Sequence, residues 1–116
     1  MTKKIFDLNI RVKSKDIVKE IYKITYNKNF DKDRGLRDQL RRSAVSIPSN
    51  IAEGYYRSSK NEFRRFLKIS KGSCGELISQ MIITDELGYL EYSLENIINE
   101  LNHLAAMIGK LITSLK

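Results

Sequence analysis

The last third of the chain carries an apolar residue at every third or fourth position, and few folds can bury such a pattern. The series is Leu94, Ile97, Leu101, Leu104, Ile108, Leu111 and Leu115. Residues with this spacing lie on one face of an α-helix, so the pattern predicts an amphipathic helix that begins at Ser93. Residues 63–84 repeat the spacing and follow Ser59-Lys60-Asn61-Glu62, a sequence typical of a capped helix start.

A third apolar series surrounds Pro48, the one proline of the chain. Its members are Leu36, Leu40, Ala44, Ile47 and Ile51. A proline inside a helix removes an N–H donor and pushes its ring toward the carbonyl four residues earlier, at a cost of about 3 kcal/mol. We interpret the segment as one helix that starts at Asp33 and bends at Pro48. The alternative is two helices separated by a turn at residues 48–50.

The N-terminal part of the chain predicts one more helix. Ile17, Ile21 and Ile24 share a face, Ser14 is a suitable N-cap, and turn-forming residues follow from residue 28. Residues 1–13 show no clear period, and we expect an extended arm there that docks on the bundle; the alternative is a frayed tail. The predicted fold class is all-α, an antiparallel up-and-down four-helix bundle in a single domain over residues 1–116.

Small and acidic residues near the proline predict close helix packing. Gly54 follows in the same helix, where it either tolerates a close helix crossing or starts the end of the helix. Each glycine inside a helix costs about 0.5–1 kcal/mol relative to alanine, so from Gly72 and Gly75 we infer tight helix contact near residues 70–74. Glu53 stands among small residues, where a carboxylate requires a partner, and we expect an ion pair with Arg42 or with an arginine of another subunit. The predicted structural residues are Pro48, Asn50, Glu53 and Gly54.

The sequence offers no catalytic constellation. His103 and Cys74 are the only residues of their types, and Cys74 lies on the apolar face of its helix, where an inert thiol is the expected interpretation. Zinc would need more ligands, and the glycines match no phosphate-binding loop. We therefore expect no enzymatic activity, no metal, no cofactor and no small-molecule substrate. The lone cysteine, the lack of a signal peptide and the lack of an apolar run of about 20 residues predict a cytoplasmic protein without membrane contact.

The net charge of +7 is unevenly distributed along the chain. Residues 34–72 hold ten Lys and Arg against three Asp and Glu, whereas residues 73–116 hold two against six. Helical spacing places several of the basic residues in rows that can meet phosphates, and Tyr55 and Tyr56 could stack on bases. The predicted nucleic-acid-binding residues are Arg34, Arg37, Arg41, Arg42, Arg57, Lys60, Arg64, Arg65, Lys68 and Lys71. The alternative is a solvated basic face neutralised by Glu95 and Glu100 of the last helix.

The two C-terminal helices carry a second apolar stripe each, which is more than a lone bundle needs. Ile69, Ile83 and Leu87 belong to one of these stripes, and Ile98 and Ile112 to the other. We expect a homo-oligomer that buries them. The alternative is that they complete an ordinary wide helix face.

Two segments resemble the 23S rRNA intervening-sequence protein family. They are L-R-D-Q-L-R-R-S-A-V-S-I-P-S-N-I-A-E-G-Y (36–55) and S-S-K-N-E-F-R-R-F-L-K-I-S-K-G-S-C-G-E-L (58–77), with further matches at Phe6-Asp7-Leu8 and 21–23. The chain departs from the family by having Ile10-Arg11-Val12 where a tryptophan often follows the arm. The basic residues that match the family's R-R and F-R-R-F stretches are Arg41, Arg42, Arg64 and Arg65.

The resemblance implies a four-helix bundle whose second helix runs through the proline, a ring-shaped homopentamer and no known enzymatic activity. Family members occur in bacterial 23S rRNA genes, and a related branch serves diversity-generating retroelements by binding a reverse transcriptase and nucleic acid. Our leading hypothesis is therefore a non-enzymatic homo-oligomer that binds structured RNA, such as rRNA, or an RNA/DNA hybrid. The alternative is a scaffold or accessory subunit for a protein partner, for example a reverse transcriptase. A nuclease is a third possibility, against which the missing acidic clusters argue.

Overall fold

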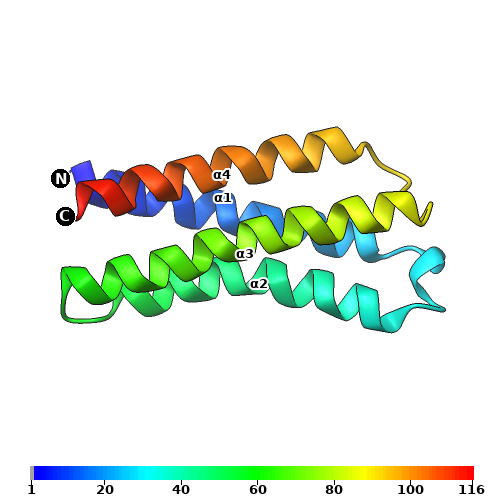
Figure 1. Ribbon diagram of the computed structural model, residues 1–116, viewed down its shortest axis with the longest axis horizontal. Helices are drawn as coiled ribbons and strands as arrows, with labels where there is room; N and C mark the ends of the chain where they lie inside the picture. Colours follow the sequence, from blue (N-terminus) through cyan, green and yellow to red (C-terminus); the bar gives the residue numbers. More distant parts are fainter. Residues whose placement is uncertain (1) are drawn as a thin grey trace.

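Four helices run alternately up and down in a bundle of 44 × 22 × 18 Å (Figure 1). The computed structural model describes residues 2–116, with side chains from residue 9 onward. The helices are α1 (Thr2–Thr25), α2 (Arg34–Tyr55), α3 (Lys60–Glu86) and α4 (Leu94–Ser114), and a short 3-10 helix, η1 (Lys28–Phe30), precedes α2. The two termini and the α2–α3 connection lie at one end, and the other two connections lie at the opposite end (Figure 1). The predicted all-α bundle is confirmed, with no strand in residues 2–116.

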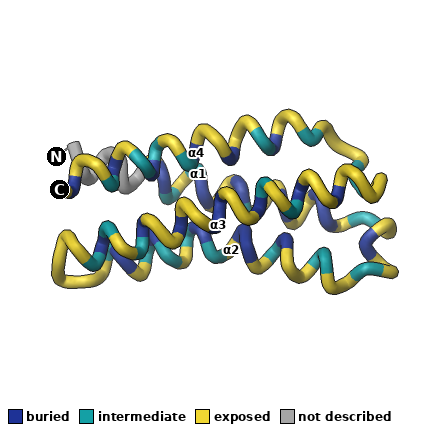
Figure 2. Tube along the Cα trace, viewed as in Figure 1, coloured by how far each residue is buried: buried dark blue, intermediate teal, exposed yellow. Residues whose placement is uncertain are grey.

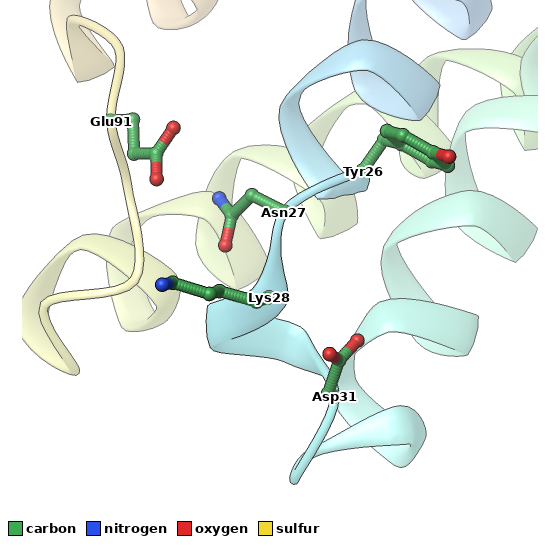
Figure 3. Close-up of a pocket in the computed structure, with 5 residues that line it drawn as sticks. All are labelled: Tyr26, Asn27, Lys28, Asp31 and Glu91. Atoms are coloured by element: carbon green, nitrogen blue, oxygen red, sulfur yellow. The ribbon is translucent and has the colours of Figure 1, made fainter.

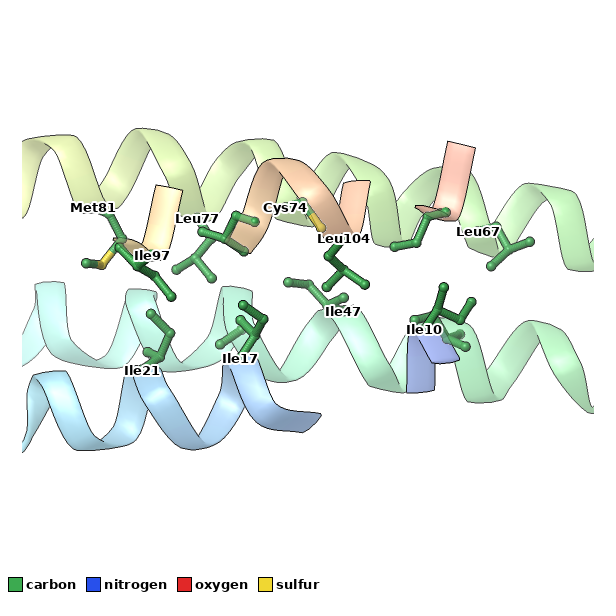
Figure 4. Close-up of a cluster of buried hydrophobic side chains, with 14 of the residues drawn as sticks. Ile10, Ile17, Ile21, Ile47, Leu67, Cys74, Leu77, Met81, Ile97 and Leu104 are labelled. Atoms are coloured by element: carbon green, nitrogen blue, oxygen red, sulfur yellow. The ribbon is translucent and has the colours of Figure 1, made fainter. Parts of the chain in front are cut away.

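The predicted apolar series form the core. Side chains from all four helices, among them Ile17, Ile47, Leu77 and Leu104, point toward one another between the helices (Figure 4). Every member of the α4 series except Leu94 is buried, and the exposed residues lie on the outward faces (Figure 2). Burial of such side chains contributes roughly 1.5–3 kcal/mol each, which makes the core the main source of stability.

The helix ends follow the predicted capping chemistry in most places. The side chain of Asp33 accepts a hydrogen bond from the backbone N–H of Leu36 at 3.2 Å, and Ser59 Oγ accepts one from Glu62 N at 3.1 Å. After α3, Gly88 adopts a left-handed conformation with φ of 76°, which a residue with a side chain adopts at a cost. Ser93 occupies the N-cap position of α4, but its side chain makes no capping hydrogen bond.

The N-terminal segment differs from the prediction. α1 begins at Thr2, so the extended arm expected over residues 1–13 is wrong for residues 2–13, while residue 1 lies outside the described structure. Ile10 is buried, and it lies one turn before the buried Ser14 and two turns before the buried Ile17. It therefore extends the inward face of the helix. Ser14 is not an N-cap: it lies inside the helix, where its Oγ donates to the Arg11 carbonyl oxygen at 3.0 Å. The side chains of Phe6, Asp7 and Leu8, which carried part of the family resemblance, lie outside the described residues.

α2 continues without interruption through Pro48, so the alternative of two helices is wrong. Side chains supply donors to the carbonyl oxygens next to the proline. Asn50 Nδ2 donates to the Ser46 carbonyl oxygen at 2.8 Å, and Ser70 Oγ of α3 donates to the Ile47 carbonyl oxygen at 2.9 Å. The carbonyl oxygen that loses its donor at the proline is that of Ala44, four residues earlier, so these hydrogen bonds do not replace the missing N–H but tie the neighbouring carbonyls to the Asn50 side chain and to α3. The bend at Pro48 stays a prediction.

α2 and α3 are in close contact at Gly54. A Cβ atom on this residue would lie 2.7 Å from Phe66 Cβ and 3.1 Å from Phe63 Cδ1. The close crossing predicted at Gly54 is confirmed. Close packing of α3 on α2 is also present near residues 70–74, where Ser70 is buried and bonds to the Ile47 carbonyl oxygen, but it does not involve the two glycines from which it was inferred, Gly72 and Gly75. Both of these glycines are exposed, and a Cβ on either would meet nothing within 4 Å. The periodicity of α3 predicted its buried face correctly, yet these two glycines fall on the opposite side.

Candidate nucleic-acid interface

The predicted basic row on α2 is partly engaged within the bundle. Arg41 Nε donates to Thr25 Oγ1 at 2.9 Å, and its guanidinium lies 4.5 Å from the centre of the Tyr22 ring. Arg37 is half-buried, with Nη1 3.9 Å from Asp31 Oδ1 and a buried Nε that lacks a hydrogen-bond partner. Only Arg34 and Arg42 of the predicted α2 residues are exposed. The α2 row therefore helps to hold α1 against α2 and leaves few cations for a ligand.

Two further predicted residues form ion pairs at the α2–α3 connection. Arg57 Nη2 lies 3.0 Å from Glu53 Oε2, and Arg65 Nε lies 2.9 Å from Glu62 Oε2. Both guanidinium groups also pack on the Phe66 ring, at 5.1 and 4.6 Å from its centre. The hydrogen bond from Arg65 holds the pKa of Glu62 below its ordinary value. The partner predicted for Glu53, Arg42, is wrong: Glu53 is exposed and pairs with the arginine one turn later.

Among the residues predicted to bind nucleic acid, the row on α3 is the most accessible group. Lys60, Lys68 and Lys71 are exposed, and they form no ion pair with a carboxylate among the described side chains. Arg64, on the same face, is half-buried, and its Nε is buried without a hydrogen-bond partner. Glu100 of α4, expected in the alternative interpretation to neutralise these cations, bonds instead to Lys13 of α1. The lysines of α3 thus keep their charge available to a ligand.

A groove between α3 and α4 adjoins this row. We call it the α3–α4 groove; it has a volume of about 430 Å³ and is lined by Lys68, Lys71, Gly72, Gly109, Ile112 and Thr113. Lys71 Nζ lies 3.2 Å from the position that a Cβ on Gly109 would take, so its ammonium group sits against the backbone of α4. The sequence did not predict the groove, because nothing in the spacing relates Gly109 and Thr113 to the lysines of α3.

Charge is segregated along the α3–α4 pair. Residues 73–109 contain six Asp and Glu and no Lys or Arg, whereas residues 60–71 contain five Lys and Arg and one Glu. Lys110 lies near the C-terminal end of α4 and Lys116 follows that helix. The end of α4 and the start of α3 lie at the same end of the bundle (Figure 1). The pair is therefore positive near the α2–α3 connection and negative near the α3–α4 connection.

A second surface cavity lies at the opposite end of the bundle. It has a volume of about 530 Å³, and Glu91 faces residues of the α1–α2 connection across it (Figure 3). Its lining residues are Tyr26, Asn27, Lys28, Asp31 and Glu91. With two carboxylates and one amine, this cavity is unsuited to an anionic ligand.

The aromatic and sulfur-containing candidates have structural surroundings. Tyr55 packs edge-on against Tyr56 and Phe63, with the Arg11 guanidinium 5.3 Å from its ring centre. Tyr56 is exposed and keeps ring surface for stacking. Burial raises the pKa of the Cys74 thiol to about 12, which suits a core residue rather than a nucleophile. The described residues contain no group of three or more potential metal ligands, and none of their helices combines the length and hydropathy needed to span a bilayer.

The fold and the basic surface define an all-helical bundle protein with one strongly cationic edge. The chain belongs to the 23S rRNA-intervening sequence protein family, whose model matches residues 6–110. A solved structure of a protein with unknown function from the S23 ribosomal protein family of Bacteroides thetaiotaomicron has a TM-score of 0.81 and 20% sequence identity. The match covers 93% of this chain and 98% of that one, and at this identity it shows a shared fold. Among curated proteins, none matches the sequence.

Proposed function

We propose that the protein is a non-enzymatic, homo-oligomeric nucleic-acid-binding protein that contacts RNA, or an RNA/DNA hybrid, through the basic edge of α3. The observation that carries the proposal is the row of Lys60, Lys68 and Lys71, which are exposed and lack carboxylate partners among the described residues. Cations that meet phosphates release the condensed counterions of the nucleic acid, and this release supplies much of the binding free energy.

The structure supports a narrower surface than the ten residues predicted from the sequence. Arg37 and Arg41 are engaged within the bundle, and Arg57 and Arg65 are paired with neighbouring carboxylates. The proposed contact residues are accordingly Lys60, Arg64, Lys68 and Lys71, with Arg34 and Arg42 as exposed cations on a separate helix.

Exposed apolar side chains on α3 support the homo-oligomer, for which a pentamer is proposed from the family resemblance. Ile69, Ile83 and Leu87 are 42%, 48% and 50% exposed and lie on one side of the helix. Light scattering of the purified protein should give a mass several times 13.5 kDa. Replacing Ile69 and Ile83 with lysine should lower that mass, whereas the control Val12→Lys, at an equally exposed site on α1, should not. A monomeric wild-type protein would contradict this part of the proposal.

Binding is tested by a mobility-shift titration against a 23S rRNA fragment at several salt concentrations. The K68E/K71E variant should bind at least about tenfold more weakly than K15E/K19E, which makes the same charge change at two exposed lysines of α1. Wild-type protein that fails to bind at low salt, or binds without salt dependence, would refute nucleic-acid recognition.

A scaffold for a protein partner is the second candidate function. The scaffold is favoured by the same exposed apolar residues of α3, which suit a protein interface as well as a subunit contact. A cytoplasmic location suits both candidate functions. An affinity purification from a bacterial lysate, with and without nuclease, separates the candidates. A specific partner such as a reverse transcriptase that survives nuclease, together with no shift of RNA, would favour the scaffold.

A further inference from the structure

We propose that the α3–α4 groove binds a backbone phosphate of the nucleic acid, with Lys68, Lys71 and Thr113 as its ligands. The inference deepens the proposed function, on which it rests, by assigning one phosphate to one place on the basic edge. The groove brings these three side chains together from two helices, α3 and α4.

The two lysines supply the charge. Both line the groove, neither has a carboxylate partner among the described side chains, and Lys71 extends across to the backbone of α4. An ammonium group held against a helix backbone has fewer conformations to lose when an anion binds, so less entropy opposes the contact. Two lysines that line one groove suit a phosphate, which offers several acceptor oxygens to their ammonium groups at once.

The two glycines supply the space. Gly72 and Gly109 belong to the groove lining on opposite helices, and no side chain on Gly72 fills the cavity. Glycine inside a helix costs about 0.5–1 kcal/mol relative to alanine, and the packing of the bundle does not account for Gly72, since a Cβ there would meet nothing within 4 Å. A glycine that internal packing does not require is expected where another molecule approaches the backbone closely.

Thr113 supplies a neutral donor. Thr113 lines the groove, and its hydroxyl makes no hydrogen bond within the described structure, unlike that of the next residue, Ser114, which donates to the Leu111 carbonyl oxygen at 2.8 Å. A free hydroxyl beside two ammonium groups can donate to the same anion, and hydrogen bonds to charged groups are stronger than neutral ones.

The occupant is a nucleic-acid strand because the cationic row continues beyond the groove. Arg64 and Lys60 precede Lys68 by four and eight residues, which corresponds to about 6 and 12 Å along the helix axis. An isolated anion would use only the groove, whereas a strand can place further phosphates against these residues. Toward the other end of α3 the charge becomes negative, so the strand should leave the groove in the direction of the α2–α3 connection.

The test is a fluorescence-anisotropy titration of the full chain with a fluorescein-labelled oligouridylate at about 50 mM salt. Gly72→Leu fills the groove without changing the charge, and it should weaken binding about tenfold, since a displaced contact of about 1.4 kcal/mol has that effect. Gly75→Leu is the matched control, because Gly75 is equally exposed in the same helix but does not line the groove. Both variants should melt at a higher temperature than wild type, since leucine favours a helix over glycine.

Thr113→Val tests the hydroxyl with little change of shape. It should also weaken binding severalfold, as expected when a hydrogen bond to a charged group is lost. If G72L and G75L bind with equal affinity, or if T113V binds as tightly as the wild type, the groove is not the phosphate site. The proposed function would still stand in that case, as long as the wild-type protein binds the oligonucleotide. Equal competition by polyglutamate, whose carboxylates are planar, would overturn phosphate recognition in the groove. No binding by the wild type would refute the proposed function itself.

Discussion

Ser70 Oγ on α3 donates a hydrogen bond to the Ile47 carbonyl oxygen on α2 at 2.9 Å, one residue before the helical proline. Ser70 is completely buried, so water cannot replace its hydroxyl. Ser70→Ala should therefore destabilise the protein by about 1–3 kcal/mol, because a buried carbonyl oxygen loses a partner. Urea unfolding followed by circular dichroism measures the change.

Ser79→Ala is the control for this prediction, since Ser79 is exposed on the same helix. Alanine favours a helix slightly over serine, so the control should be neutral or mildly stabilising. Equal stability of the two variants would mean that the Ser70 hydroxyl contributes nothing near the proline.

Gly54→Ala should destabilise the bundle, because its Cβ would lie only 2.7 Å from Phe66 Cβ. Relieving such a contact requires a shift of α2 against α3, with a cost of about 1–3 kcal/mol. Gly75→Ala adds the same methyl group in open space and should stabilise by about 0.5–1 kcal/mol. If the close contact at Gly54 controls the packing, the melting temperature should fall in Gly54→Ala and rise in Gly75→Ala. Changes of the same sign in both variants would contradict that role of the contact.

The contrast between these glycines marks what the sequence can predict. Apolar periodicity identifies the inward face of each helix, and it correctly predicted the buried residues of α3 and α4. The same spacing places Gly54, three residues after Ile51, on the buried face of α2, and places Gly72 on the outward side of α3. It does not give the distance between two helices, so it could not show that a Cβ on Gly54 would collide with α3.

Cys74 should be unreactive toward a thiol reagent in the folded protein. Burial raises the pKa of its thiol to about 12, so at pH 8 almost no thiolate is present, and solvent does not reach the sulfur. The absorbance released from Ellman's reagent should stay near zero under native conditions and reach one equivalent in denaturant. Rapid reaction of the native protein would show that the core opens near Cys74.

The ion pair between Lys13 and Glu100 should make the α1–α4 contact sensitive to acid. The hydrogen bond and charge of Lys13 hold the pKa of Glu100 below its ordinary value. A lowered carboxyl pKa contributes stability that is present above about pH 4.3, the ordinary value for glutamate, and is lost as the pH falls through the lowered value.

Glu100→Gln should therefore reduce stability at pH 7 by about 0.2–1 kcal/mol, the range for exposed ion pairs, and by less at pH 3. Glu95→Gln serves as the control, since Glu95 is exposed on α4 and has no ion pair in the described structure. A pH-independent difference between the two variants would contradict the role of the ion pair.

Paired and unpaired cations should differ in their effect on RNA binding. K60Q/K71Q removes two free charges and should reduce the slope of log affinity against log salt by about 1.4, given about 0.7 per phosphate contact with a single strand. R57Q/R65Q removes two charges that Glu53 and Glu62 already neutralise, so the slope should change less. The two slopes are measured in parallel, and identical losses would mean that net charge alone governs binding.

The division between paired and unpaired basic residues could be predicted from the sequence only in part. Helical spacing grouped Arg34, Arg37 and Arg41 correctly on one face, but the spacing within one helix does not reveal that Arg41 contacts α1 or that Arg37 lies beside Asp31. The pairs of Arg57 with Glu53 and Arg65 with Glu62 could have been found, because residues three or four apart in a helix are neighbours. The groove could not, since half of its lining comes from α4.

The separation of charge along α3 and α4 also affects how a ligand arrives. An elongated molecule with opposite charges toward its two ends is turned by the field of an approaching polyanion before the surfaces touch, so that the end near the α2–α3 connection leads. Encounters would then be productive more often than random collision allows. This advantage fades once the ionic atmosphere shrinks to about 10 Å, well below the length of the bundle, at 0.1 M salt.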